Sequence, residues 1–87
     1  MQEALDDTSV EAAIYAALRR VKPSLENVPM TPQTRFENLG LQSIEMISVV
    51  FEIEEAFGVS IVDQQMDGFR TVAEARTVVQ KLARGKS

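Results

Sequence analysis

The sequence of 87 residues contains neither cysteine nor histidine. Without cysteine, the chain can form no disulfide and no thiolate metal site. Without histidine, it lacks the commonest general base, which a serine nucleophile normally needs beside it, and a common ligand of transition metals. The sequence also shows no glycine-rich phosphate loop and no spaced set of metal ligands. We therefore expect no catalytic residues and no metal site, and predict a protein that binds or is acted upon.

Long hydrophobic runs are missing too. No segment is apolar over the length of a membrane span, and no basic and apolar leader is apparent. Hydrophobic residues still make up 45% of the chain, which is enough for an ordinary globular core. The length predicts a single domain over residues 1–87, with an ordered core at about residues 8–84. We expect a monomeric, cytoplasmic protein that does not bind membranes.

Positive charge is absent from the middle of the chain. Between Phe36 and Phe69 there is no lysine or arginine, and seven acids give this stretch a charge of −7, whereas the flanks sum to +3. The acids are Glu37, Glu45, Glu52, Glu54, Glu55, Asp63 and Asp67. Such a field can attract basic partners and repel nucleic acid, so we expect no nucleic-acid binding. A solvated acidic face that only aids solubility explains the same pattern, and charge alone favours that explanation.

Hydrophobic periodicity predicts a first helix over residues 10–22. Thr8 and Glu11 have the spacing of a capping box before it, and Pro23 ends it. A long loop follows, over residues 23–42, without a sustained period. We expect its apolar residues to hold it on the core: Leu25, Val28, Phe36, Leu39 and Leu41.

A second helix is predicted over residues 44–57, with Ser43 as its N-cap and Gly58 in a left-handed turn after it. Its apolar arc is wide, so we expect it to be the central helix; the arc comprises Met46, Ile47, Val49, Val50, Ile53, Ala56 and Phe57, bordered by Ile44 and Phe51. The opposite face carries Glu45, Ser48, Glu52 and Glu55.

Two further helices complete the predicted fold. Residues 63–67 can form about one turn, and residues 72–83 form the last helix, with Thr71 and Glu74 in a second capping-box pattern. The expected fold class is all-α: a small four-helix bundle with a long loop between the first two helices and a short third helix.

Ser43 is notable for its position. It stands where the long loop meets the second helix, and the first amides of a helix lack internal acceptors while the helix dipole is positive there. A phosphate ester on its hydroxyl would be received favourably at this place. Ser43 can equally be an ordinary N-cap with no further role.

The residues around Ser43 resemble the acyl carrier protein family. The matching residues are Phe36, Leu39, Gly40, Leu41, Ser43 and Ile44, then Ile47, Val50 and Ile53, then Glu54, Glu55, Phe57, Gly58, Val59 and Ile61, and finally Thr71 and Val72. The series has matching spacing without gaps and spans nearly the whole chain. The resemblance implies a four-helix bundle with a short third helix, of the acyl-carrier type.

The resemblance also implies a cofactor and a function. A phosphopantetheinyl transferase would move 4′-phosphopantetheine from coenzyme A to Ser43, flanked by Gln42 and Ile44, and the thiol of the arm would carry acyl intermediates as thioesters. The carrier would deliver them to biosynthetic enzymes of a fatty acid, polyketide or related pathway. An aminoacyl or peptidyl carrier is the alternative, and an unmodified helical interaction module is a further one.

Acids on the second and third helices of this family meet basic patches on partner enzymes, that is, acyl- or aminoacyl-loading, acyl-transfer or condensing enzymes. The corresponding residues here are Glu45, Glu52, Glu55 and Asp63. This chain departs from the family pattern at Gln42, where Asp usually precedes the modified serine. Ser48, Gln64 and Gln65 also replace common acids, which indicates a specialised carrier.

Overall fold

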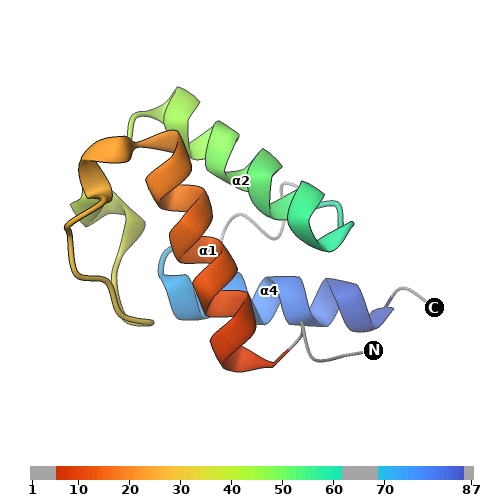
Figure 1. Cartoon of the computed structure of the whole chain (residues 1–87). Helices are drawn as coiled ribbons and strands as arrows, with labels where there is room; N and C mark the ends of the chain where they lie inside the picture. Colours follow the sequence, from red (N-terminus) through yellow and green to blue (C-terminus); the bar gives the residue numbers. More distant parts are fainter. Residues whose placement is uncertain (1–5, 62–68, 86–87) are drawn as a thin grey trace.

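The computed structural model describes residues 6–61 and 69–85. Within them lie the α-helices α1 (Asp7–Val21), α2 (Ser43–Phe57) and α4 (Val72–Gly85) and the 3-10 helices η2 (Pro23–Leu25) and η3 (Phe36–Leu39). Figure 1 shows their arrangement, and the all-α fold is confirmed. The predicted short helix over residues 63–67 lies outside the described residues. No helix in the described part of the chain has the length and hydropathy to cross a membrane.

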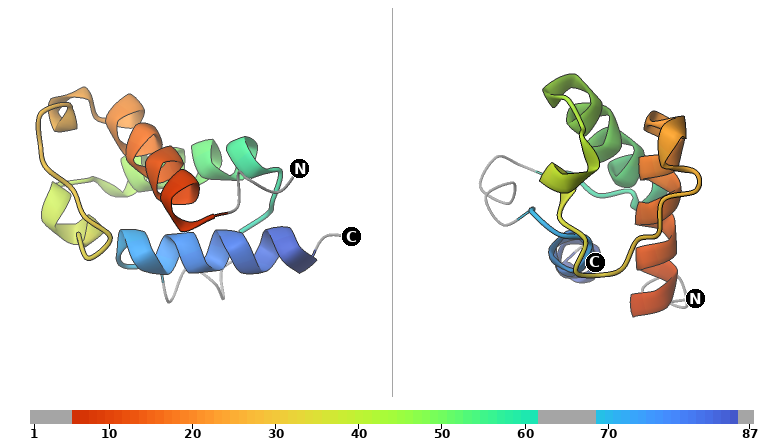
Figure 2. Two further views of the ribbon diagram at one scale, coloured as in Figure 1. Left: turned by 60° about the horizontal axis from the view of Figure 1, so that its bottom comes forward. Right: turned by 90° about the vertical axis from the view of Figure 1, so that its left-hand side faces the viewer.

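Helix α1 is the central element of the described fold. It contacts both α2 and α4, and both views of Figure 2 show it beside these two helices. Ile14 and Leu18 of α1 are 0% exposed, and small Ala17 is also buried, so neighbours can approach closely. Among the described helices, α1 rather than α2 thus takes the central position that was predicted for α2. Part of the apolar arc of α2 is exposed, at Ile44, Ile47 and Phe51.

The buried core combines one face of each helix. Its members on α1 are Val10, Ile14, Ala17 and Leu18; on α2 they are Val49, Val50 and Ile53; on α4 they are Val72, Ala75 and Val79. Leu25, Phe36 and Phe69 join this cluster from outside the α-helices. On α2 the buried residues belong to the apolar arc predicted from helical spacing, but Ile47 of the same arc is 51% exposed.

The start of α1 differs from the prediction. The helix begins at Asp7, with Asp6 before it in an extended conformation, and Thr8 lies inside the first turn. Glu11 does not cap the helix, because its carboxylate accepts a hydrogen bond from the Arg76 guanidinium on α4. Asp7 also lies 3.7 Å from Arg76 and accepts a hydrogen bond from Gln80. These acids therefore connect α1 to α4.

The long loop is held at both of its ends. Near its start, the Arg19 guanidinium donates to the carbonyls of Leu25 and Val28, each at 3.2 Å. Leu25 and Phe36 are buried, and Val28, Leu39 and Leu41 pack against the core from partly exposed positions. The prediction that these apolar residues hold the loop is confirmed. The loop is also more regular than expected, since it contains η2 and η3.

The ends of α2 and the start of α4 follow the predicted local signals in part. Gly58 has φ 64°, the left-handed conformation expected after α2. At α4, the Thr71 hydroxyl accepts the Glu74 N–H at 3.1 Å, while Glu74 accepts the N–H of Arg70 rather than that of Thr71. Glu54 falls among the apolar residues of α2 by its position in the sequence. Its carboxylate is satisfied there, because it accepts the Ile61 N–H at 2.7 Å.

Candidate functional site

Ser43 is the first residue of α2, and its side chain is exposed. The N-cap is Gln42, with φ −81° and ψ 164°, and the Gln42 carbonyl accepts the first helical hydrogen bond from Met46 at 2.9 Å. The prediction of Ser43 as the N-cap was therefore wrong by one residue. Within the described chain, the Ser43 hydroxyl makes no hydrogen bond, so no capping contact has to be broken for another atom to reach it.

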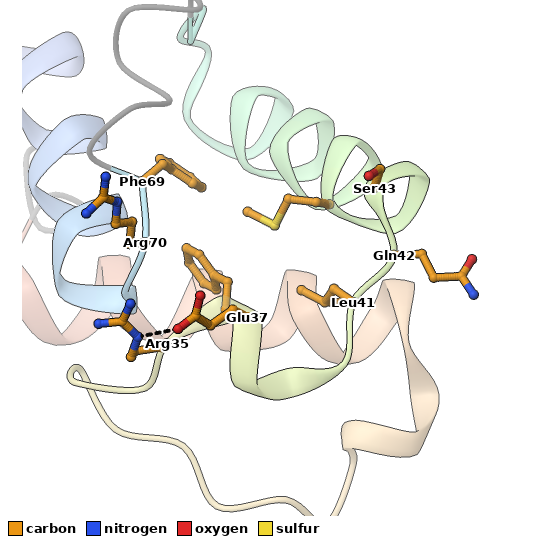
Figure 3. Close-up of a pocket in the computed structure, with 9 residues that line it drawn as sticks. Arg35, Glu37, Leu41, Gln42, Ser43, Phe69 and Arg70 are labelled. Atoms are coloured by element: carbon orange, nitrogen blue, oxygen red, sulfur yellow. Dashed lines mark hydrogen bonds and ion pairs between the residues drawn. The ribbon is translucent and has the colours of Figure 1, made fainter.

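Glu45 holds the beginning of α2 in place. Its carboxylate accepts the N–H of Gln42 at 2.8 Å, which satisfies a donor that precedes the helix. The side chain of Gln42 points away from the helix in Figure 3. The carboxylate that stabilises the start of α2 thus belongs to Glu45 of the same helix. The Gln42 residue beside Ser43 is exposed.

The turn at Gly40 directs the chain from η3 into α2. Gly40 has φ 71° and ψ 26°, a left-handed conformation in which side chains with a Cβ are strained. Phe36, at the start of η3, is buried and fixes one side of this turn. Leu41, on the other side, packs against the core. Ser43 therefore emerges at a position set by contacts on both sides of the glycine.

An open pocket of about 270 Å³ lies beside Ser43. It is lined by Arg35, Phe36, Glu37, Leu41, Gln42, Ser43, Met46, Phe69 and Arg70. Figure 3 shows these side chains around it, with Ser43 on one side and both arginines on the other. The aromatic rings of Phe36 and Phe69 stack with their centroids 5.5 Å apart. The pocket thus combines an apolar lining with a basic rim opposite the serine.

Backbone hydrogen bonds bring the two arginines together. The N–H of Phe36 donates to the carbonyl of Arg70 at 2.9 Å, and the N–H of Val72 donates to the carbonyl of Thr34 at 3.1 Å. Arg35 and Thr71 form an isolated antiparallel bridge. As a result, Arg35 and Arg70, which flank the acidic stretch in the sequence, lie at the same rim of the pocket.

Two of the predicted partner-binding acids are engaged within the fold. Glu52 forms an ion pair with Arg20 of α1, and Glu45 lies 3.8 Å from Lys22. Glu37, in the same acidic stretch, pairs with Arg35 at 2.9 Å. The negative charge of this stretch is therefore partly balanced by bases that lie outside it in the sequence.

Glu55 and Asp63 are the other two predicted partner-binding acids. Glu55 is exposed, and no cation of the described residues lies within ion-pair distance of it. Asp63 lies outside the described residues. Among the three predicted partner-binding acids that the structure describes, Glu55 is therefore the one that forms no ion pair with another described residue.

An apolar stripe accompanies Ser43 along α2. Ile44, Ile47 and Phe51 are 68%, 51% and 64% exposed, and their spacing of three and four residues puts them on one helix face. Glu55 continues this face by one more turn. We refer to Ile44, Ile47 and Phe51 as the α2 stripe. Contiguous exposed apolar surface is typical of interaction sites.

The sequence did not reveal the pocket. Arg35 and Arg70 are far apart in the chain, and neither stands in a recognisable motif. Their one shared signal is that they flank the stretch without bases. Nor did helical spacing show that Glu52 faces Arg20 of α1 or that Glu45 faces Lys22 just after it, because spacing contains no information about the neighbouring helix.

Comparison with known proteins supports a single interpretation of this site. The protein family described as "Phosphopantetheine attachment site" matches residues 14–78, about three quarters of the chain. The matched region contains Ser43, the pocket and the α2 stripe. No solved structure matches the chain.

Three relatives illustrate the similarity. An acyl carrier protein of Phytoplasma australiense is 37% identical over 59 residues, which cover 67% of this chain and 78% of the relative. The meromycolate extension acyl carrier protein of Mycobacterium leprae is 34% identical over 72 residues, covering 82% of this chain and 59% of the relative. The chloroplastic acyl carrier protein 2 of Spinacia oleracea is 28% identical over 61 residues, covering 70% of this chain and 47% of the relative. The chain thus spans only about half the length of some relatives.

Proposed function

Because this chain belongs to the family of phosphopantetheine-binding acyl carrier proteins, we propose that Ser43 bears the 4′-phosphopantetheine arm. Carriers of this family are non-catalytic. The observation that carries the assignment is the exposed Ser43 hydroxyl, which caps no helix and stands at the edge of a pocket within the matched region. The first amides of α2 can receive a phosphate at this position.

The attachment step needs only the hydroxyl of Ser43 from this chain. Its Oγ forms a bond to the phosphorus of the pantetheine phosphate in coenzyme A, and the pyrophosphate P–O bond breaks. Adenosine 3′,5′-bisphosphate leaves with the bonding electron pair, and the hydroxyl proton passes to a base of the transferase. The arm then supplies a thiol, which explains how a chain without cysteine can hold acyl groups as thioesters.

Incubation of the purified chain with coenzyme A and a broad-specificity phosphopantetheinyl transferase tests this function. We expect the intact mass to increase by one phosphopantetheine per chain, because the described structure leaves the hydroxyl of Ser43 accessible. Intact-protein mass spectrometry measures the increase. A chain that gains no mass with any of several transferases, including one from its own cell, contradicts the proposal.

Acyl groups are the cargo we propose, in line with the names of the three relatives. An aminoacyl cargo stays the alternative, and thioesters released from the native protein would distinguish the two. The pathway, whether fatty acid, polyketide or another, stays a prediction. So does the cytoplasmic location, since one relative is a chloroplast protein.

We further propose that partner enzymes dock on the α2 stripe and Glu55. The stripe begins directly after Ser43, so a partner bound there lies next to the arm. Glu55 adds a charge that a basic patch on the partner can meet. Glu45 and Glu52 contribute less to this surface than the sequence suggested, because Lys22 and Arg20 already face them.

Charge reversal at Glu55 and at Glu52 should therefore have different effects. Glu55→Lys is expected to slow acyl transfer severalfold at low salt without altering stability, because Glu55 is exposed and unpaired within the described chain. Glu52→Lys removes the ion pair with Arg20 and sets two cations together, which we expect to cost about 1 kcal/mol of unfolding free energy. Transfer kinetics and urea unfolding of both variants provide the two measurements.

A charge added outside the α2 stripe provides the control for this docking surface. Ser60, exposed beyond the end of α2, can be replaced by lysine to add a charge away from the stripe. Ser60→Lys and Glu55→Gln each raise the net charge by one. If these two variants slow transfer equally, the effect arises from net charge, and the proposed surface is wrong.

A further inference from the structure

We infer that the pocket beside Ser43 favours acyl cargo that ends in a carboxylate, with Arg70 as the residue that pairs with it. The inference rests on the proposed attachment of the arm to Ser43, and it assigns a substrate class to the same site. It follows from the apolar lining of the pocket, from the fact that one of its two arginines is ion-paired and the other is not, and from the position of both arginines relative to Ser43.

The lining of the pocket suits a short chain of carbon atoms. Phe36 and Phe69 are each 5% exposed and contribute their stacked rings, and Leu41 and Met46 add aliphatic and thioether surface. A dry cavity of about 150 Å³ holds a benzene molecule, so 270 Å³ has room for about six to ten carbon atoms. The pocket is open on one side, which favours the lower part of that range.

The two arginines differ in their partners. Arg35 donates to the Glu37 carboxylate at 2.9 Å, so its charge is largely balanced. The guanidinium of Arg70 has no ion pair or hydrogen bond within the described chain. Its main chain is fixed nevertheless, because its N–H donates to Glu74 at 2.8 Å and its carbonyl accepts from Phe36. Arg70 is thus an anchored residue with an available charge, at the end of a stretch of acids.

The position of Arg70 indicates which part of a loaded carrier it would meet. The phosphate of the arm is bonded to Ser43 Oγ and stays at the start of α2, whereas Figure 3 shows Arg70 on the opposite side of the pocket. Beyond its phosphate, the pantetheine arm contains only uncharged amides, a hydroxyl and sulfur. An anionic group at the far rim must therefore belong to the cargo.

Two cargoes of nearly equal size test the inference. The carrier is loaded from adipoyl-coenzyme A, a six-carbon acyl group with a terminal carboxylate, and from adipamoyl-coenzyme A, in which an uncharged amide replaces that carboxylate. Mass spectrometry verifies the loading of each sample. The rate of thioester cleavage by hydroxylamine, normalised to the same coenzyme A thioester in solution, then reports how well the pocket protects each cargo.

We expect the adipoyl thioester to be cleaved about 1.5- to fivefold more slowly than the adipamoyl thioester, the range of an exposed ion pair. High salt should reduce the ratio toward one. Arg70→Gln should remove the difference, and Arg70→Lys should retain much of it. Glu37→Gln should enlarge it, because this substitution frees the guanidinium of Arg35.

Arg84→Gln provides the matched control, since Arg84 is exposed near the end of α4 and does not line the pocket. This variant should keep the wild-type ratio. Equal protection of the two cargoes in the wild type, or a difference that persists in Arg70→Gln, overturns the inference and leaves the proposed function intact. A chain that cannot be loaded at all overturns both.

Discussion

Replacing Ser43 by alanine is expected to abolish phosphopantetheine addition completely. The reaction requires an oxygen nucleophile, and alanine removes the one hydroxyl that stands at the entrance of both the pocket and α2. No partial activity should remain, since Gln42 and Ile44 on either side have no hydroxyl. Intact-protein mass spectrometry after incubation with transferase and coenzyme A measures the loss.

This variant should fold as the wild type does. Ser43 is exposed, makes no side-chain hydrogen bond in the described structure and lies in the first helical turn, where alanine is a good helix former. Ser48→Ala and Ser60→Ala are the controls, because each removes a hydroxyl at another place, Ser48 within α2 and Ser60 after its end, and should leave the mass increase unchanged. Addition that persists in Ser43→Ala, or disappears in Ser60→Ala, would place the attachment at another residue.

Phe36→Ala is expected to lower the free energy of unfolding by about 3–5 kcal/mol, as is typical when a buried phenylalanine is truncated. Phe36 is 5% exposed and stacks on Phe69, and its N–H binds the carbonyl of Arg70. Its ring therefore joins the two segments that form the pocket. A domain of this size has about 4–13 kcal/mol of stability, so the variant should be near the limit of folding.

Phe51→Ala is the matched control for this prediction. The same truncation at a side chain that is 64% exposed should change the unfolding free energy by no more than about 0.5 kcal/mol. Urea unfolding followed by circular dichroism measures both, and Phe36→Leu gives a milder variant if Phe36→Ala does not fold. Similar losses for Phe36→Ala and Phe51→Ala would contradict the packing described for the pocket. Phe51→Ala should nevertheless weaken partner docking, because it shortens the α2 stripe.

Local patterns predicted the helices well. Apolar spacing predicted helices over residues 44–57 and 72–83, and the structure has Ser43–Phe57 and Val72–Gly85. Gly58 and the hydroxyl of Thr71 take the roles that their residue types indicate. These features depend on neighbours within about one helical turn, so a single sequence contains them.

Two of the failures concern acids that had more than one available partner. Glu11 was expected to cap α1, but Arg76 offers it a charged partner on α4. Glu52 was expected to face solvent, but α1 presents Arg20 to it. A capping box and a cross-helix ion pair use the same carboxylate, and the choice between them depends on which helix packs nearby.

The order and spacing of residues by themselves determined that this chain is an all-α member of the carrier family, with a serine where a helix begins. They determined this because periodicity, glycine turns and the Ser43 motif are local properties. The structure showed that Gln42, not Ser43, is the N-cap of α2, and only tertiary contacts decided that Arg70 lies across a pocket from Ser43. Contacts between segments that are distant in the sequence arise from helix packing, and packing brought these residues together.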